Sequence, residues 1–511
     1  MFVRTHAAAL VGIDALPVAV EVNIAGGGLG LYLVGLPDNA VKESEERIRA
    51  AFENSEERFS GRKVVVNLAP ADLKKEGAAF DLPIAIGILS AMGRVETTLL
   101  DETMLAGELS LDGGVKPVRG VLSLALAARK AGLKRLILSE ENVAEAAVVR
   151  ELEIIGVKSL RQTIDYLNGE LTLAAAEAVE VLEMEQAGRY ADDFADVKGQ
   201  LHVKRALEIA AAGGHNILMI GSPGSGKTML ARRLPTILPP LQLEEALETT
   251  KIHSVAGLQR FEGLMSSRPF RAPHHTASPV SLIGGGQTPR PGEVSLAHNG
   301  VLFLDELPEF GRSVLEVLRQ PLEDREIVVS RARYNVTYPA NFTLVAAMNP
   351  CPCGDYNHPT KECTCSPGAV HRYMGRISGP LMDRIDMHIE VTPVEPSELQ
   401  SAEEGERSSV VRERVMRARE IQRRRFEGIE GVHTNARMNS AMVRQYCTLD
   451  EASDRLLKRA MERLSLSARA FDRILKVART IADLAGREQI AQSDVAEAIG
   501  YRSLDRGNWG I

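Results

Sequence analysis

The sequence has few aromatic side chains and no long apolar run. Phe, Tyr and Trp together make up 4% of its 511 residues, and only one residue is Trp. No apolar stretch approaches the roughly 18 residues of a membrane-spanning helix, so we expect no membrane segment. Asp14 interrupts the short apolar stretch near the N-terminus, which argues against a signal peptide. These absences predict a cytoplasmic protein.

An excess of positive charge is also missing. The formal net charge is −7 at pH 7, which excludes a uniformly basic nucleic-acid coat. It does not exclude a ring that binds DNA, because a few basic side chains per subunit can line a pore. Hydrophobic residues at 44% and charged residues at 25% are the balance of an ordinary globular protein. The length allows about three domains.

Cysteine is scarce, and four of the five cysteines fall within residues 351–365. In a reducing compartment such clustering favours a metal site over disulfides. Two Cys-x-Cys pairs across a loop rich in Gly, Asn and Pro can surround a tetrahedral Zn²⁺. A loop this small has little core of its own, so a bound metal would be needed to order it. The predicted structural zinc ligands are Cys351, Cys353, Cys363 and Cys365, with His358 and His371 in reserve and unmetallated thiols as the alternative.

A glycine-rich loop predicts a nucleotide site. Apolar residues 217–220 indicate a short buried strand, and the next eight residues fit the pattern G-x-x-x-x-G-K-[ST]. Glycines lack a Cβ, so the backbone N–H groups of such a loop can surround phosphate oxygens. Lys227 would reach the β- and γ-phosphates of ATP, and the Thr228 hydroxyl would bind Mg²⁺. The predicted nucleotide-binding residues are Gly221, Ser222, Pro223, Gly224, Ser225, Gly226, Lys227 and Thr228.

Two later strands each end in polar residues. Gly300-Val-Leu-Phe-Leu is followed by Asp305 and Glu306, at the carboxyl end of a strand, where α/β sheets place their ligands. Asp305 would hold Mg²⁺ and Glu306 would polarise the attacking water. Two adjacent carboxylates at a buried strand end are costly unless a metal or hydrogen-bond donors compensate their charge, which favours these roles over a merely structural pair. Residues 343–348 lead in the same way to Asn349. In AAA+ ATPases, which this order of motifs resembles, such an amide orients the water beside the γ-phosphate.

Three arginines are candidates for contact with the γ-phosphate, all by resemblance to ATPases of this kind. Gly379-Pro-Leu-Met-Asp-Arg-Ile-Asp resembles the segment that carries an arginine finger, which implies that Arg384 reaches a neighbouring subunit and that the protein is an oligomer. The alternative for Arg384 is a surface ion pair with a neighbouring Asp. In the helical segment 466–484, Arg469 would be the second sensor, acting within its own subunit. Arg473 lies one helical turn away, so the sequence does not separate the two.

The first 170 residues alternate β-like runs (18–24, 64–68) with a helical pattern over 39–52. Gly35-Leu-Pro-Asp-Asn-Ala-Val-Lys-Glu-Ser and Val66-Asn-Leu-Ala-Pro-Ala-Asp-Leu-Lys-Lys-Glu-Gly resemble the ComM/YifB family of magnesium-chelatase-like proteins. Residues 107–120 resemble the proteolytic domain of Lon more loosely.

Where Lon has its serine nucleophile, this chain reads Gly77-Ala-Ala-Phe-Asp81, with no hydroxyl. Where Lon has its lysine, Gly120-Val-Leu-Ser offers no amine. Acyl transfer needs both groups, so protease activity is not expected. A role in oligomerisation or DNA contact is the favoured interpretation of this domain.

Two insertions set the chain apart from simpler ATPases. Arg268-Pro-Phe-Arg-Ala-Pro-His-His275 is a specific match to the magnesium-chelatase-like group, and its adjacent histidines are expected to make structural hydrogen bonds rather than bind metal. Residues 327–338 alternate like a β-hairpin. Its tip would carry Arg331 and Arg333, which could follow a DNA backbone, although packing between subunits is the alternative. The basic segment 410–426 is either a solvated helix or a further DNA contact.

The resemblance to the ComM/YifB family covers nearly the whole chain. It implies a cytoplasmic hexameric motor, a helicase that acts on single-stranded and branched DNA and promotes branch migration of recombination intermediates in natural transformation. A magnesium-chelatase motor subunit, whose resemblance is to 192–511, and a protein-remodelling ATPase are the alternatives. The predicted fold is α/β, and its parts are an α+β Lon-protease-like domain (ribosomal S5 domain 2-like, 1–170), a linker (171–191), an AAA+ P-loop ATPase core (192–394) and a C-terminal helical lid (395–511).

Overall fold

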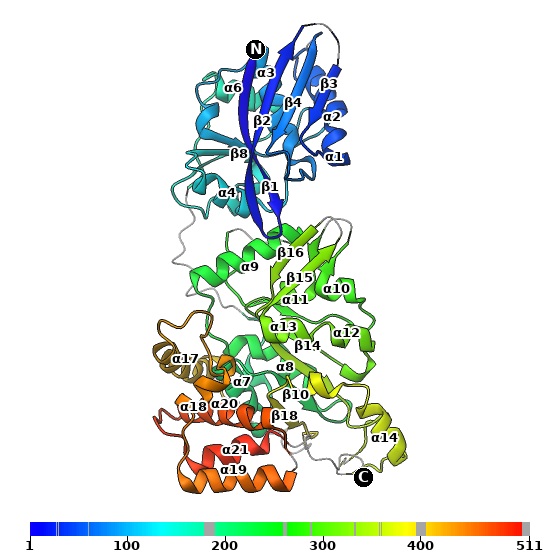
Figure 1. Cartoon of the computed structure of the whole chain (residues 1–511), viewed down its shortest axis with the longest axis vertical. Coiled ribbons are helices and arrows are strands. Elements are labelled where there is room, and N and C mark those ends of the chain that lie inside the picture. The colour runs from blue at the N-terminus through cyan, green and yellow to red at the C-terminus, as the bar shows by residue number, and fades with distance from the viewer. Residues whose placement is uncertain are drawn as a thin grey trace. The chain divides into compact units, whose positions relative to one another are not determined.

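The computed structural model describes residues 1–26, 28, 30–59, 61–177, 190–258, 263–286, 289–331, 334–356, 358, 360–394, 405–464 and 466–502. The predicted linker lies largely outside these ranges, as does the start of the predicted lid. The chain forms two compact units (Figure 1). The first comprises Met1–Glu183, Gln242–Met265 and Pro289–Pro291, and the second comprises Met184–Leu241, Ser266–Thr288 and Gly292–Ile511.

The first unit is built on a seven-stranded mixed sheet in the order β3-β4-β2-β1-β5-β8-β9. Its strands are β1 (Phe2–Val11), β2 (Asp14–Ala25), β3 (Gly30–Val34), β4 (Lys63–Ala69), β5 (Thr103–Leu105), β8 (Arg135–Ser139) and β9 (Glu153–Val157), with β6 (Glu108–Leu109), β7 (Val115–Lys116) and β13 (Arg290–Pro291) outside it. Its helices are α1 (Asn39–Lys42), α2 (Ser44–Asn54), α3 (Asp81–Ala91), α4 (Val121–Lys130), α5 (Val143–Ala146), α6 (Leu160–Leu167) and α9 (Leu243–Ala256).

Alternation of side chains explains how this sheet forms its core. On β2, Val18, Val20 and Val22 are buried while the residues between them are more exposed, as the period of a strand requires. They face α3, every residue of which is buried. The only charged side chain on α3 is Asp81, and Arg47 donates two hydrogen bonds to it at 2.6 and 2.9 Å. The carboxylate that ends the Gly77–Asp81 stretch is therefore part of a structural ion pair.

Helix α9 packs in the first unit, although the sequence places it within the ATPase core. It lies against α4, and Leu247 contributes to the same apolar cluster. Lys251 pairs with Asp14, and the Ser254 hydroxyl donates to the buried carboxylate of Glu145. Helical periodicity predicts that α9 has an apolar face but does not specify which core covers it.

The second unit contains a five-stranded parallel sheet in the order β11-β14-β17-β10-β18. These strands are β11 (Phe270–Arg271), β14 (Val301–Leu304), β17 (Thr343–Met348), β10 (Ile217–Ile220) and β18 (Met387–Glu390). Its helices are α7 (Leu201–Gly213), α8 (Lys227–Ile237), α10 (Pro279–Ile283), α11 (Glu293–Leu296), α12 (Arg312–Glu316), α13 (Arg319–Asp324), α14 (Pro367–Met374) and α15 (Gly379–Met382), with β12 (Gly284–Gly285) nearby in sequence. Because the strands are parallel, the ends of β10, β14 and β17 meet at one edge of the sheet.

The last helices form a separate layer of the second unit. They are α17 (Ser408–Arg425), α18 (Ser440–Tyr446), α19 (Glu451–Leu464), α20 (Ala468–Leu484) and α21 (Gln492–Gly500), the last three orange to red in Figure 1. A buried polar junction joins α20 to the sheet: His215 Nε2 lies 2.8 Å from Thr480 Oγ1, and Arg473 pairs with Asp386. No helix in the described ranges is long and apolar enough to cross a membrane.

Candidate functional site

The loop between β10 and α8 has the backbone that phosphate binding requires. A Cβ on Gly221 would lie 2.2 Å from the Val391 carbonyl oxygen, so only glycine fits where the strand ends. Gly226 precedes α8 at φ +90°, a left-handed conformation that glycine adopts without strain. No side chain caps α8. Its first N–H groups are therefore available to an anion in the loop.

Lys227 joins this loop to the neighbouring strand. Its ammonium donates to the carbonyls of Gly221 and Ser222 at 2.6 and 2.9 Å, and to Asn349 Oδ1 at 3.3 Å. The residue is 8% exposed, and burial lowers the pKa of its ammonium although Asp305 and Glu306 act in the opposite direction. A buried cation held only by neutral oxygens is a ready partner for phosphate.

Thr228 and Asp305 meet as the sequence predicts for a Mg²⁺ site. The Thr228 hydroxyl donates to Asp305 Oδ2 at 2.7 Å, and Asp305 Oδ1 accepts the N–H of Glu306 at 2.9 Å. A hydroxyl and a carboxylate are the hard oxygen ligands that Mg²⁺ prefers, with phosphate oxygens completing its shell. The Ser222 and Ser225 hydroxyls are buried without a partner among the described residues, so the loop holds further unused donors.

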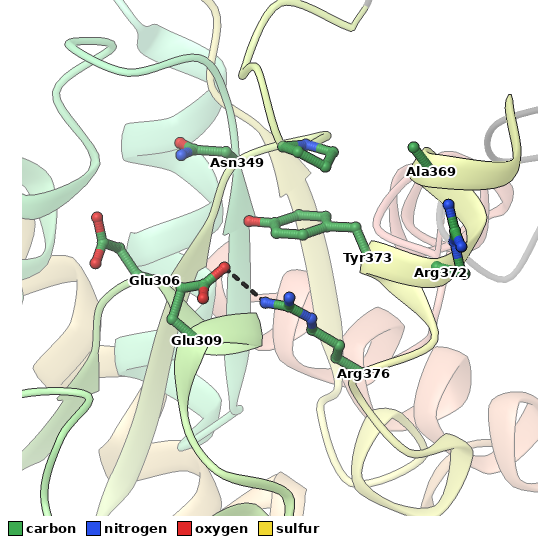
Figure 2. Close-up of a pocket in the computed structure, with 8 residues that line it drawn as sticks. Glu306, Glu309, Asn349, Ala369, Arg372, Tyr373 and Arg376 are labelled. Atoms are coloured by element: carbon green, nitrogen blue, oxygen red, sulfur yellow. Dashed lines mark hydrogen bonds and ion pairs between the residues drawn. The ribbon is translucent and has the colours of Figure 1, made fainter. Parts of the chain in front are cut away.

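Glu306 and Asn349 border a cleft of about 620 Å³ (Figure 2). The opposite wall comes from α14, which carries Arg372 and Tyr373, and from the loop after it, which carries Arg376. The cleft is lined by Glu306, Glu309, Asn349, Pro352, Ala369, Arg372, Tyr373 and Arg376. Arg376 donates to Glu309 at 2.8 Å, and burial raises the pKa of Tyr373 to about 12. The sequence did not point to Arg372 or Arg376, because no motif marks them.

The two adjacent histidines have different partners. His274 Nδ1 lies 2.9 Å from the Thr276 hydroxyl, a local contact of the structural kind that the sequence predicts. His275 Nδ1 lies 3.1 Å from Glu306 Oε2. The sequence analysis missed this second contact, since the residues are separated by thirty positions and only the fold brings them together.

The three candidate arginines line one cleft of about 160 Å³, together with Glu323, Asp383, Asp472 and Lys476. Arg384 is 8% exposed and pairs with Glu323, rather than with the aspartates beside it in sequence. Arg473 is committed to the buried pair with Asp386. Arg469 is 64% exposed and contacts Asp383 at 3.3 Å. Geometry thus distinguishes Arg469 from Arg473, and the phosphate-sensing roles stay predictions.

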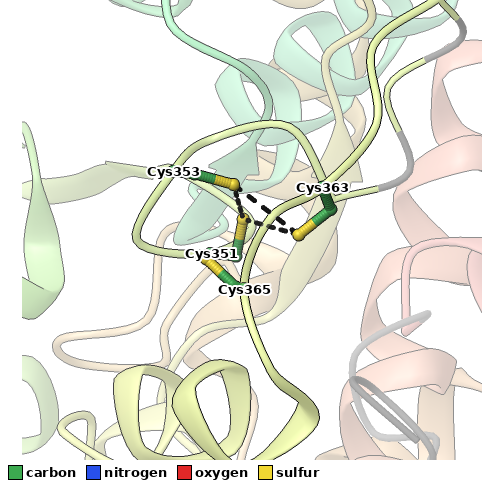
Figure 3. A group of neighbouring side chains, drawn as sticks. All are labelled: Cys351, Cys353, Cys363 and Cys365. Carbon is green, nitrogen blue, oxygen red and sulfur yellow. Dashed lines mark hydrogen bonds between the residues drawn. The ribbon is translucent and has the colours of Figure 1, made fainter.

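The four predicted cysteines form one cluster (Figure 3). Their sulfur atoms lie within 4.8 Å of one another, and Cys351 Sγ is 3.3 Å from Cys353 Sγ and 3.7 Å from Cys363 Sγ. Tetrahedral Zn²⁺ with bonds of about 2.3 Å separates its sulfurs by about 3.8 Å, so the thiols fit this ion. The backbone N–H of Asp355 lowers the pKa of Cys353 to about 6, whereas burial and the neighbouring thiols raise the pKa of Cys363 to about 12 and also raise that of Cys365, so the fit to Zn²⁺ rests on the sulfur geometry.

The reserve ligand His358 has another role, because its Nδ1 accepts the N–H groups of Thr360 and Lys361 at 3.2 Å. The cysteine loop also lies against the phosphate loop: a Cβ on Gly354 would be 2.4 Å from Pro223 Cδ. A metal clip in this loop would therefore sit next to the nucleotide site.

The predicted hairpin is present as β15 (Glu326–Arg331) and β16 (Tyr334–Pro339), paired in antiparallel register from Glu326 with Pro339 to Arg331 with Tyr334. Arg331 ends β15, and Arg333 lies outside the described residues.

The basic helix α17 uses much of its charge internally. Arg414 pairs with Glu208 and Glu406, and Arg423 pairs with Glu420. These contacts favour a structural and solvated role for this helix over DNA contact.

Comparison with known proteins gives matches along most of the chain. A family model described as magnesium chelatase, subunit ChlI, matches residues 193–399, its C-terminal counterpart matches 405–502, and one described as subunit ChlI of Mg-chelatase matches 20–142. Competence protein ComM of Haemophilus influenzae is 46% identical over 98% of this chain and 97% of its own length. The uncharacterized protein YifB of Escherichia coli is 43% identical, with the same coverage. Lon protease 2 of Bacillus subtilis is 33% identical over 100 residues, which are 19% of this chain and 17% of that protein.

Proposed function

This chain belongs to the ComM/YifB family of magnesium-chelatase-like AAA+ proteins, and we propose that it is an ATP-driven motor acting on single-stranded and branched DNA. Its α/β fold class is the predicted one, with an AAA+ P-loop core, a helical lid and a Lon-protease-like first unit. The DNA substrate, branch migration in natural transformation, the hexamer and the cytoplasmic location are parts of the proposal.

The observation that carries the ATPase proposal is the convergence of five side chains at three strand ends. Lys227 and Asn349 are in contact at the end of β10 and β17, and Thr228 and Asp305 are in contact beside β14. Lys227 would exchange its carbonyl partners for phosphate oxygens, and Asn349 would orient the attacking water. Bound Mg²⁺ would neutralise phosphate charge. Glu306, at the rim of the cleft, would polarise that water.

A ring of subunits is proposed because the resemblance gives Arg384 the place of an arginine finger. Its guanidinium lies in the separate arginine cleft with Glu323, so it would have to exchange Glu323 for a neighbouring subunit's γ-phosphate. Arg469 lines the same cleft and is the more exposed of the two lid arginines. A hexamer would repeat this contact around a closed ring.

The DNA substrate is supported by two observations. The Haemophilus influenzae relative is named as a competence protein. Strand β15 ends at Arg331 and Arg333 follows it in the sequence, and a basic hairpin of this kind suits contact with a phosphodiester backbone.

Branch migration can be measured directly with a synthetic three-stranded or four-stranded junction labelled on one strand. We expect wild-type protein with ATP and Mg²⁺ to displace the labelled strand, and Glu306→Gln to bind ATP without displacing it. Arg331→Ala combined with Arg333→Ala should retain ATP binding and lose displacement, with Arg423→Ala as a control for charge removal. Vigorous ATP hydrolysis without displacement on any junction would contradict the DNA-motor proposal.

A chelatase motor is the second candidate, because the matching family models carry that description. The first unit does not separate the two functions, since a chelatase-described model also matches residues 20–142. The two functions differ in whether the protein needs partner subunits. A chelatase motor would need partner subunits for its function, whereas a DNA motor should hydrolyse ATP faster with DNA alone.

We also propose that the cysteine cluster holds structural Zn²⁺. Four protein thiolates leave no open position, so the ion would order the loop without taking part in chemistry. Purified protein should contain about one zinc per chain, and Cys363→Ser should lose it while Cys447→Ser, outside the cluster, should keep it. Zinc-free protein with an ordered loop and full activity would overturn this assignment.

A further inference from the structure

The segment Arg268–His275 is bound to the ATPase core by several side-chain contacts. The Arg268 guanidinium donates to the carbonyls of Pro239 and Asn299 at 2.6 and 2.7 Å. Phe270 stacks on Phe303 of β14 with ring centres 5.9 Å apart. Arg271 donates two hydrogen bonds to Glu293, at 2.6 and 2.7 Å. These contacts fix the course of the segment as it leaves the edge strand β11.

The end of this fixed segment reaches the catalytic carboxylate. His275 Nδ1 lies 3.1 Å from Glu306 Oε2, and the edge of Phe310 packs against the imidazole with ring centres 6.4 Å apart. This contact is an ion pair when the imidazole carries both of its ring protons. The imidazole is therefore held by its contact with Glu306, by Phe310 and by the His274 ring, whose centre lies 4.1 Å from that of His275.

Glu306 needs such a partner more than an ordinary surface glutamate does. Its backbone is left-handed at φ +52°, and its side chain is 55% exposed. Among the described residues, His275 is the one ion-pair partner of its carboxylate. An exposed carboxylate on a short strand end samples several rotamers, and only some would align it with an attacking water.

We propose that His275 is a positioning residue that holds the Glu306 carboxylate in the orientation required for ATP hydrolysis. The inference rests on the proposed ATPase function and deepens it. It gives the Arg268–His275 segment a role: its arginines and Phe270 anchor the backbone, and its last histidine places Nδ1 3.1 Å from the carboxylate of the catalytic glutamate. Nucleotide binding, which depends on Lys227 and Thr228, does not use this contact.

Variants at two adjacent histidines test the proposal. His275→Ala removes the donor. His275→Asn returns an amide N–H near the place of Nδ1, whereas His275→Gln places its amide near Nε2. His274→Ala is the control for loss of the neighbouring ring: His274 packs on His275 with ring centres 4.1 Å apart and contacts Thr276, but it does not contact Glu306. For each variant we would measure kcat for ATP, the affinity for a fluorescent ATP analogue and the melting temperature.

We expect His275→Ala and His275→Gln to lower kcat by about tenfold or more, the scale on which a misplaced catalytic group acts, with unchanged nucleotide affinity. His275→Asn should recover much of the loss, and His274→Ala should match wild type. Unchanged or increased kcat in His275→Ala overturns the proposal, as does a loss that the Asn variant shares in full. Wild-type protein without ATPase activity would instead overturn the proposed function itself.

Discussion

Replacing Asp386 with Ala should destabilise the second unit far more than the same change at Asp383. Both aspartates lie between α15 and β18, and each pairs with an arginine of α20. Asp386 is 3% exposed, accepts the N–H of Asn216 at 2.9 Å and contacts Arg473. Asp383 is 37% exposed, and Arg469 lies 3.3 Å from it. The two sites are matched in chemistry and differ in burial.

The expected magnitudes follow from that difference. Removing one partner of a buried ion pair leaves the other charge uncompensated, which costs about 3–5 kcal/mol of unfolding free energy. Asp386→Ala also leaves a buried N–H of Asn216 without its acceptor. An exposed ion pair contributes at most about 1 kcal/mol. Since domains unfold with about 5–15 kcal/mol, the first change should lower the melting temperature markedly and the second should barely alter it.

The same pair predicts a pH dependence. Burial alone would raise the pKa of Asp386, but Arg473, His215 and the N–H of Asn216 outweigh it and hold that pKa well below its usual range. A depressed folded-state pKa stabilises the protein fully above the unfolded-state value of about 3.9, and this stability is lost as the pH falls through the folded-state pKa. The difference in unfolding free energy between wild type and Asp386→Asn should therefore shrink below about pH 4.

Denaturant unfolding followed by circular dichroism, at neutral pH and in steps down to about pH 3, would measure these differences. Equal destabilisation by Asp386→Ala and Asp383→Ala would refute the argument from burial. A difference between wild type and Asp386→Asn that grows on acidification would refute the assignment of a depressed pKa.

Three further changes test the nucleotide site. Lys227→Ala should abolish measurable binding of a fluorescent ATP analogue with little change in melting temperature, and retained affinity would contradict the assigned role of its ammonium. Gly354→Ala should weaken that affinity about tenfold, because the new Cβ would lie 2.4 Å from Pro223 Cδ; wild-type affinity would mean that the cysteine loop does not support the phosphate loop. Arg384→Ala should bind ATP and fail in turnover, and adding a Lys227→Ala subunit should restore some activity if Arg384 acts between subunits.

Local motifs predicted the strands and the ligand-bearing strand ends. The predicted strand 217–220 is β10, and Asp305 follows β14 directly, because short apolar runs that end in polar residues have few other stable arrangements in a parallel sheet. The helical pattern over 39–52 was also identified, although the structure divides it at Glu43 into α1 and α2.

Contacts between distant segments were not predictable in this way. Periodicity shows that α9 has an apolar face, yet only the fold places it on α4. Arg469 and Arg473 occupy successive turns of α20 and have the same chemistry, so only burial distinguishes them. His275 and Glu306 belong to separate motifs, and their contact depends on the alignment of β11 beside β14.

The central claim, that ATP hydrolysis by this chain drives work on DNA, is tested most directly by one measurement. It is the steady-state ATPase rate of the purified protein with no DNA, with single-stranded DNA and with a branched junction, beside Glu306→Gln under the same conditions. We predict stimulation of several-fold by DNA and no turnover in the variant. Wild-type turnover that is indifferent to both kinds of DNA would contradict the claim.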